Sequence, residues 1–295
     1  MINKLTIIGV GLIGGSLARA LKRAGACKKI VGCGRERAHL QKALELGVID
    51  RCEFDVGAAV QDADVVMLAV PVGAMEDVLR RMQNRLAPHT IITDAGSTKG
   101  SVVEAARRVF GAVPATFVPG HPIAGTEQSG VEASFAELFQ GRRVILTPLR
   151  DTDAQAVAQV RALWESAGAC VSEMDVRRHD EVLAAVSHLP HVLAYALVDS
   201  LARLDNSAEL FNYAAGGFRD FTRIASSDPT MWRDICLANR GALLAVLEHF
   251  NDDLRRLTEA LRARDDVRIL EIFTRAKMVR DRVILHDGPP STNHY

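Results

Sequence analysis

The stretch LTIIGVGLIGGS, Leu5–Ser16, decides the fold of this chain. It opens with the apolar run Leu5–Ile8, which predicts a buried strand. After the glycines, Leu17 and Leu21 recur at helical spacing and predict an amphipathic helix. The chain is therefore expected to begin with a strand, a glycine turn and a helix.

The turn carries three glycines at GxGxxG spacing, Gly9, Gly11 and Gly14. In a dinucleotide-binding turn the first permits the tight bend, the second lets the backbone approach a pyrophosphate, and the third allows close helix–strand packing. The backbone N–H groups at the start of the helix, Leu12 and Ile13, then face the phosphates. We predict a dinucleotide site here, with a structural glycine turn as the alternative.

The composition narrows the class of protein. A chain of 295 residues with 48% hydrophobic residues suits one large or two medium domains. The formal net charge is zero, which gives no electrostatic reason to expect a nucleic-acid or anionic membrane partner. No apolar stretch approaches the roughly 20 residues of a membrane-spanning helix. The glycines also interrupt the N-terminal apolar run, which argues against a signal peptide.

Five scattered cysteines with no CxxC pattern indicate neither a disulfide framework nor a zinc site. Reduced thiols in a cytoplasmic protein are the expectation.

Further apolar segments alternate with helical patterns and predict a parallel, doubly wound Rossmann-type α/β sheet. Ser101 and Glu104 match a capping box, so a helix is expected from Ser101. From about residue 176 strand signals stop and long helical periods follow. The expected domains are a dinucleotide-binding domain, 1–175, an all-helical domain, 176–285, and a tail, 286–295. The expected strands after the first are 28–34, 63–70, 88–94, 116–120, 143–147 and 169–174.

The end of the second strand bears on the choice of cofactor. An enzyme that prefers NAD usually places an acidic residue there to hold the ribose 2′-hydroxyl. This chain has Arg35, Glu36 and Arg37 instead. The arginines suit a 2′-phosphate and Glu36 still suits the hydroxyl, so NAD(P)+ is expected, with a lean to NADP+ or dual use. The arginines can also simply flank a solvated helix start.

His121 is the leading catalytic candidate. Because it precedes Pro122, its backbone is extended, and we expect it in a glycine-flanked loop at the cofactor edge of the sheet. A neutral imidazole there can accept a proton from a substrate hydroxyl while hydride leaves the same carbon. The alternative is a loop histidine that is hydrogen-bonded to the backbone. Ser97, on a neighbouring loop, can orient that hydroxyl, or it can serve the turn alone.

Two further clusters lie in the helical region. His188 and His191 are three residues apart and share a helix face unless Pro190 bends it. They suit substrate contact or core packing, and no set of acidic or cysteine residues completes a metal site. In the next cluster, Arg219 and Arg223 lie one turn apart and suit a carboxylate, although surface ion pairing is the alternative. Trp232 suits the core or the site.

These motifs together resemble the prephenate/arogenate dehydrogenase family of tyrosine biosynthesis. The resemblance implies an N-terminal Rossmann domain, a helical C-terminal domain that forms an intertwined homodimer, and oxidative decarboxylation of a cyclohexadienyl substrate to a 4-hydroxyphenyl product. The matching stretches follow one another along nearly the whole chain: GVGLIGGS (9–16), DAGSTKG (94–100), HPIAGTEQSG (121–130), SHLPH (187–191) and GGFRDFTRIASSDPTMWRDI (216–235).

The resemblance also implies roles for single residues. His121 accepts a hydrogen bond from the ring 4-hydroxyl, Ser97 orients that hydroxyl, and Arg223 binds a substrate carboxylate. The remaining matches are to residues that line or gate the pocket: His191, Arg219, Glu127 and Trp232. The family's acidic residue at the end of the second strand is displaced or absent here.

Two other functions stay open on the sequence. One is a β-hydroxyacid dehydrogenase or imine reductase, but that class commonly relies on a lysine at the start of the helical domain, and no lysine lies between Lys99 and Lys277. The other is a nicotinamide-binding redox sensor without enzymatic activity, which leaves His121 and the paired arginines unexplained.

Overall fold

Two compact units make up the chain, residues 1–243 and 244–295, and each is described by itself. The computed structural model describes residues 1–126 and 128–285. The predicted site residue Glu127 and the predicted tail, 286–295, lie outside the described residues.

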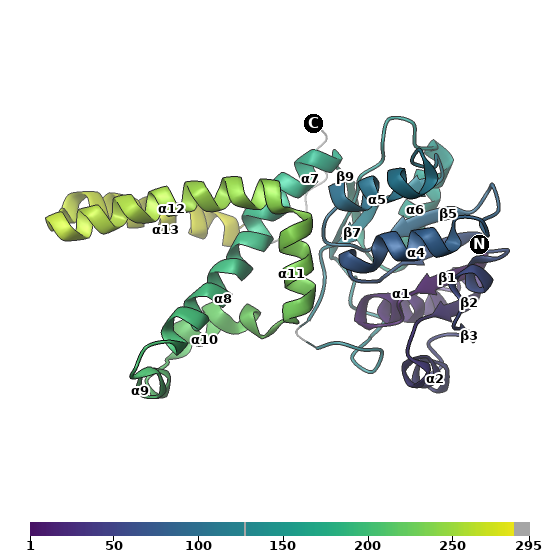
Figure 1. The fold of residues 1–295 in the computed structure, drawn as a ribbon, viewed down its shortest axis with the longest axis horizontal. Helices are drawn as coiled ribbons and strands as arrows, with labels where there is room; N and C mark the ends of the chain where they lie inside the picture. Colours follow the sequence, from purple (N-terminus) through teal and green to yellow (C-terminus); the bar gives the residue numbers. More distant parts are fainter. Residues whose placement is uncertain (127, 286–295) are drawn as a thin grey trace. The chain divides into compact units, whose positions relative to one another are not determined.

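A six-stranded parallel sheet in the order β3-β2-β1-β4-β5-β6 forms the centre of the first unit (Figure 1). In this order the sheet grows from β1 to β3 on one side and from β4 to β6 on the other, as in dinucleotide-binding folds. The sequence did not reveal β3, because its three residues, Arg-Cys-Glu, are only partly buried at the sheet edge. The strands are β1 (Ile2–Ile8), β2 (Cys27–Cys33), β3 (Arg51–Glu53), β4 (Val65–Leu68), β5 (Ile91–Asp94) and β6 (Phe117–Val118).

Helices cover both faces of this sheet, which is therefore doubly wound as predicted. One face packs an apolar core around Leu5 and Trp164, and the other packs a core around Leu68 and Phe117. The first core takes side chains from α1 (Leu12–Arg23), α2 (Arg37–Glu45) and α6 (Ala154–Ser166). The second takes them from α3 (Val56–Val60), α4 (Met75–Met82) and α5 (Gly100–Phe110), and a short 3-10 turn, η1 (Val72–Ala74), precedes α4.

A second, three-stranded sheet was not predicted. It contains β7 (Gly120–Pro122), β8 (Arg143–Leu146) and β9 (Cys170–Glu173) in that order. Strand β7 runs antiparallel to β8, with His121 opposite Ile145, while β8 and β9 are parallel. The expected strand 116–120 is thus two strands, since the chain changes sheets at Pro119, which has no N–H for a ladder. The expected loop position of His121 is wrong: it lies in a strand.

From Val176 onward the chain is helical, as predicted. Asp175 accepts hydrogen bonds from the backbone of Arg177 and Arg178 and so caps the first of these helices. In the first unit follow α7 (Val176–Leu183), a π-helical turn η2 (Ala184–His188), α8 (Leu189–Ala202), α9 (Ser207–Asn212), α10 (Gly216–Thr222), a 3-10 turn η3 (Arg223–Ser226) and α11 (Pro229–Ala238). Helix α12 (Arg240–Ala263) starts at the end of this unit, and α13 (Asp266–Leu285) belongs to the second unit.

The run Val176–Ala202 has two notable properties. Its π-helical turn ends two residues before Pro190, which lacks an N–H for the carbonyl of Val186 and would clash with it in a regular α-helix. By length and mean hydropathy it is also the one helix, among the residues described, that is apolar enough to cross a membrane. The expectation that no segment reaches that length is therefore wrong. In this structure 22% of the tested window is buried, and the run carries the buried His179 and His188.

Candidate active site

The three glycines of the first turn differ in their surroundings as a dinucleotide site requires. Gly9 has a positive φ of 95°, and a Cβ there would lie 2.3 Å from the carbonyl oxygen of Ala69. A Cβ on Gly14 would lie 2.2 Å from the carbonyl oxygen of Gly9. A Cβ on Gly11 would meet no atom of the described residues within 4 Å. The fold thus requires two of the glycines, and the third leaves room for a ligand.

The start of α1 fits the phosphates of such a ligand. Gly11 is its N-cap residue, and no side chain caps the helix. The first N–H groups of a helix have no partner within the helix, and they carry its positive partial charge. The N–H groups of Leu12 and Ile13 are therefore available to anionic oxygens.

The two arginines that follow β2, Arg35 and Arg37, have different surroundings. The guanidinium of Arg37 lies over the ring of Phe54, 4.3 Å from its centroid. The carboxylate of Glu36 lies 3.4 Å from the imidazole of His39. Arg35 is exposed at the carboxyl end of the strand. Of the two arginines, Arg35 is therefore the better placed for a ribose phosphate.

A buried ion pair joins the two segments that carry Ser97 and His121. The ammonium of Lys99 pairs with the carboxylate of Asp94 at the end of β5, and both side chains are fully buried. Asp94 accepts a hydrogen bond from the N–H of Gly120 (3.1 Å), and Lys99 donates one to the carbonyl of Gly120 (2.6 Å). Burial lowers the pKa of Lys99, and the Asp94 carboxylate opposes this effect. The pair fixes the start of β7, the strand of His121.

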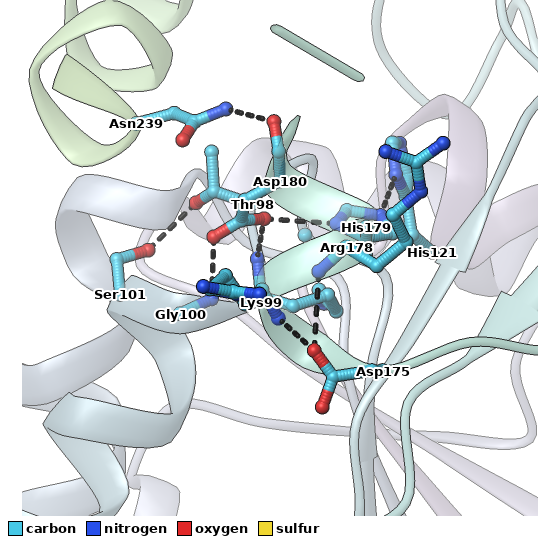
Figure 2. A network of polar contacts seen from close by, with 12 residues as sticks. Thr98, Lys99, Gly100, Ser101, His121, Asp175, Arg178, His179, Asp180 and Asn239 are labelled. Atoms are coloured by element: carbon cyan, nitrogen blue, oxygen red, sulfur yellow. Dashed lines mark hydrogen bonds and ion pairs between the residues drawn. The ribbon is translucent and has the colours of Figure 1, made fainter. Parts of the chain in front are cut away.

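His121 is linked to a second histidine and a carboxylate (Figure 2). Its Nδ1 lies 2.9 Å from Nε2 of His179, and Nδ1 of His179 lies 2.8 Å from Oδ1 of Asp180. His121 is 9% exposed, and burial holds its pKa well below the ordinary value, with the nearby His179 and Lys99 acting in the same direction. The imidazole of His121 is thus neutral at neutral pH and can accept a proton.

Asp180 also determines how α5 begins. Its two carboxylate oxygens accept hydrogen bonds from the N–H groups of Lys99 and Gly100, at 2.8 Å each (Figure 2). Burial raises the pKa of Asp180, but the hydrogen bonds from His179 and from these amides outweigh it and hold the pKa below its ordinary value. The capping box expected from Ser101 and Glu104 is wrong, because α5 starts at Gly100 without a local side-chain cap.

The two predicted histidines of the helical region lie on the same side of it, both against Trp232. His191 stacks on the indole with ring centroids 3.6 Å apart, and His188 meets it edge to face at 6.0 Å. Trp232 is 8% exposed, so it belongs to the core and to this cluster at once. The π-helical turn and Pro190 therefore do not separate the two rings.

Asn239 connects this cluster to Asp180. Its Nδ2 donates to the carbonyl oxygen of Asp180 (2.8 Å) and faces Nδ1 of His188 (3.1 Å). Burial lowers the pKa of His188 to about 4. A single network thus reaches from α11 to β7.

The remaining predicted residues lie around this network. Ser97 is half-buried in the loop between β5 and α5. Arg219 in α10 and Arg223, the first residue of η3, are exposed, and α8, which carries His191, packs against both elements. The hydroxyl of Tyr195 on α8 donates to the carbonyl of the residue after η3 (2.6 Å) and fixes that contact. Within residues 1–126 and 128–285, no group of three or more His, Cys, Asp or Glu could hold a metal ion.

Sequence reasoning did not single out four residues of the network: Lys99, His179, Asp180 and Asn239. The signals for them are the stretch DAGSTKG, which contains Lys99, and the adjacent His-Asp pair soon after the last strand. Adjacency does not show that His179 contacts His121, 58 residues earlier.

Comparison with known proteins gives one consistent result. Residues 17–173 match the family described as prephenate dehydrogenase, nucleotide-binding domain, and residues 175–275 match prephenate dehydrogenase, dimerization domain. The chain is 42% identical to the cyclohexadienyl dehydrogenase of Zymomonas mobilis, over 94% of both chains.

Two solved structures are also similar over most of the chain. The prephenate dehydrogenase of Aquifex aeolicus, in complex with hydroxyphenyl propionate and NAD+, has a TM-score of 0.89 at 38% identity and covers 96% of this chain and 99% of its own. The Synechocystis arogenate dehydrogenase has a TM-score of 0.80 at 28% identity and covers 95% and 99%.

Proposed function

The chain belongs to the prephenate dehydrogenase family, and we propose that it oxidatively decarboxylates prephenate, arogenate or both, with hydride transfer to a nicotinamide cofactor. Family membership replaces the two alternatives left by the sequence, a β-hydroxyacid dehydrogenase and a redox sensor. The helical domain is the family's dimerization domain, so the enzyme is a homodimer. Helices α12 and α13 expose large apolar side chains for such an interface: Leu254, Leu261, Leu270 and Phe273.

The observation that carries the proposal is the neutral, buried imidazole of His121 at the end of a hydrogen-bonded line to Asp180. A base that accepts a hydroxyl proton must be unprotonated at working pH and held in one orientation. Burial provides the first condition and the contact with His179 provides the second.

The proton balance of the reaction fits a base that accepts the hydroxyl proton and later returns it to the product. Oxidation of the ring alcohol transfers the hydroxyl proton to His121 as hydride leaves the same ring carbon. The nicotinamide, when bound, accepts that hydride. Loss of the ring carboxylate as CO₂ leaves its electron pair in the ring, so the ring oxygen becomes a phenolate. The phenolate then takes the proton back from His121, and no net proton is released.

Other residues would hold the substrate. Ser97 would orient the ring hydroxyl, and Arg223 with Arg219 would bind a carboxylate, since a guanidinium matches carboxylate geometry. His191 and Trp232 would line the pocket, supported by their stacking beside α11. Glu127, outside the described residues, is proposed for the same pocket on the family match of its motif.

The nucleotide would lie on the turn of Gly9, Gly11 and Gly14, supported by the open space at Gly11 and the uncapped start of α1. We propose NADP+ or dual use because Arg35 is exposed at the end of β2. We also keep the domain boundary near 175, since β9 ends at Glu173 and α7 begins at Val176.

The test is a two-by-two assay of the purified enzyme. Prephenate and arogenate are each supplied with NAD+ and with NADP+, and cofactor reduction is followed by absorbance together with CO₂ release. We expect one CO₂ per reduced cofactor with at least one substrate. Absence of reduction in all four combinations would overturn the proposed function.

A further inference from the structure

The line from His121 through His179 to Asp180 determines which nitrogen of His121 carries its proton. An ionised carboxylate only accepts hydrogen bonds, so Nδ1 of His179 must donate to Asp180. In a neutral His179 the other nitrogen, Nε2, is then an acceptor, and Nδ1 of His121 must donate to it. A neutral His121 with its proton on Nδ1 has its free lone pair on Nε2.

The charges around the line favour this arrangement. The alternative is a His179 protonated on both nitrogens, which donates to His121 and reverses the tautomer of that ring. His179 is fully buried, and the buried ammonium of Lys99 already provides a cation beside the line. Asp94 neutralises that ammonium, and His188 is the other titratable group that faces the line. A protonated His179 would place a second cation in this buried region with the Asp180 carboxylate as its counter-charge, and burying a further charge costs free energy even when it is paired.

We propose that Asp180, acting through His179, is the positioning residue that keeps Nε2 of His121 available as the base. The proposal rests on the proposed function. Asp180 touches neither the substrate's reacting atoms nor His121. It fixes the tautomer of His179, and the tautomer of His179 fixes that of His121. Its charge also stabilises the imidazolium formed while the hydroxyl proton resides on His121.

The start of α5 determines where the Asp180 carboxylate lies. The amides of Lys99 and Gly100 hold its two oxygens, and a Cβ on Gly100 would lie 2.8 Å from Oδ2. That separation is too short for a carbon–oxygen contact, so the carboxylate would have to move. Gly100 is helical, and alanine suits a helix better than glycine. Gly100→Ala therefore displaces the Asp180 carboxylate without removing any titratable group of the line.

The first test compares Gly100→Ala with Gly241→Ala, a helical position where a Cβ meets no described atom within 4 Å. For Gly100→Ala we expect kcat to fall about 10- to 100-fold, as for other partners that orient a functional histidine, with KM nearly unchanged. Gly241→Ala should keep both constants. Wild-type kcat in a folded Gly100→Ala protein would overturn the proposal.

A second variant keeps the proposal testable if Gly100→Ala does not fold. Asp180→Asn removes the charge at constant size, so the linked imidazoles become less basic. We expect lower kcat and an acid limb of kcat/KM that moves to lower pH. If Asp180 had only a structural role, Asp180→Asn would lower the yield of folded enzyme and leave the acid limb of kcat/KM at the same pH. That result would contradict the proposal.

The third measurement needs no substrate. Nitrogen NMR of the wild-type protein with labelled imidazoles reports which ring nitrogen carries hydrogen. We expect the proton of both His121 and His179 on Nδ1, and a changed pattern in Gly100→Ala. A proton on Nε2 of His121 would overturn the proposal even if the enzyme oxidises prephenate. An enzyme without dehydrogenase activity but with this pattern would instead contradict the proposed function alone.

Discussion

The glycine turn is proposed to bind the cofactor and the histidine network to assist the chemistry, and the two are formed by different kinds of contact. The turn consists of six consecutive residues, Gly9–Gly14, and its geometry follows from local backbone conformation. The network joins β7, α7, the π-helical turn and α11, with His121 and His179 58 residues apart and Asp180 and Asn239 59 apart. The turn can therefore be recognised in the sequence, whereas the network exists only in the folded chain.

This difference separates binding from chemistry. Changes in the turn should affect cofactor affinity and leave the imidazoles unchanged. Changes in the network should affect turnover and leave cofactor affinity unchanged.

The largest effect on binding is expected at Gly11. Gly11→Ala places a methyl group in the space left for the pyrophosphate, so contacts from charged phosphate oxygens to backbone N–H groups are lost. Hydrogen bonds to charged groups contribute about 1.5–3 kcal/mol, so we expect cofactor affinity to fall about 100-fold at an unchanged melting temperature. Fluorescence titration of the cofactor and thermal unfolding measure the two quantities.

Gly9→Ala is the matched control for this variant. Its positive φ and the backbone oxygen of Ala69 at 2.3 Å should reduce the free energy of unfolding by more than about 1 kcal/mol. Equal destabilisation by the two substitutions would contradict the distinction between a glycine needed by the fold and one needed by the ligand.

A smaller effect is expected for binding of the substrate's carboxylate. Arg223→Ala should raise KM for prephenate about tenfold, the lower end of the range for a charged hydrogen bond, because Arg223 is exposed. Initial rates at varied substrate concentration check this. Arg203→Ala, which removes an exposed arginine paired with Asp199, is the control. An unchanged KM in Arg223→Ala would argue against its role in binding.

A still smaller effect is expected for cofactor preference. Exposed charge pairs contribute up to about 1 kcal/mol, so Arg35→Ala should lower the preference for NADP+ over NAD+ by about fivefold at most. The ratio of kcat/KM for the two cofactors is the measurement. Arg37→Ala, whose guanidinium rests on Phe54, should change that ratio less. A larger change in Arg37→Ala than in Arg35→Ala would reverse the assignment.

The smallest effect at neutral pH concerns stability. Burial lowers the pKa of His188 from 6.5 to about 4, so between these values the unfolded chain binds a proton that the folded chain does not. Stability should therefore fall as the pH drops below about 6.5, with this histidine adding about 1.4 kcal/mol per pH unit to the slope. Urea unfolding of wild type and His188→Asn between pH 7.5 and 4.5 tests this. The control is His89→Asn, which replaces an exposed histidine and should keep the wild-type dependence of stability on pH. A wild-type pH dependence in His188→Asn would contradict the role assigned to His188.

The sequence could predict features that depend on local patterns, but not those that depend on contacts between distant residues. The first strand, the glycine turn and the change to helices near 176 depend on local patterns, and the structure bears them out. The second sheet escaped prediction because β7 contains only three residues and pairs with a strand 20 residues away. The cap of α5 by Asp180 escaped because its partner is 81 residues distant. The motif of His121 predicts a functional residue there, but the sequence did not predict its contacts, since a His-Asp pair on a helix has no sequence feature that shows which residue it contacts.

The central claim is that His121 performs the proton transfer and that the cofactor site does not depend on it. The direct test measures cofactor affinity and single-turnover hydride transfer on the same sample of His121→Asn. We expect affinity within about twofold of wild type, while hydride transfer from prephenate or arogenate falls by about 10³-fold, within the range of general base catalysis. Near-wild-type hydride transfer in this variant would contradict the claim, as would a parallel loss of cofactor affinity.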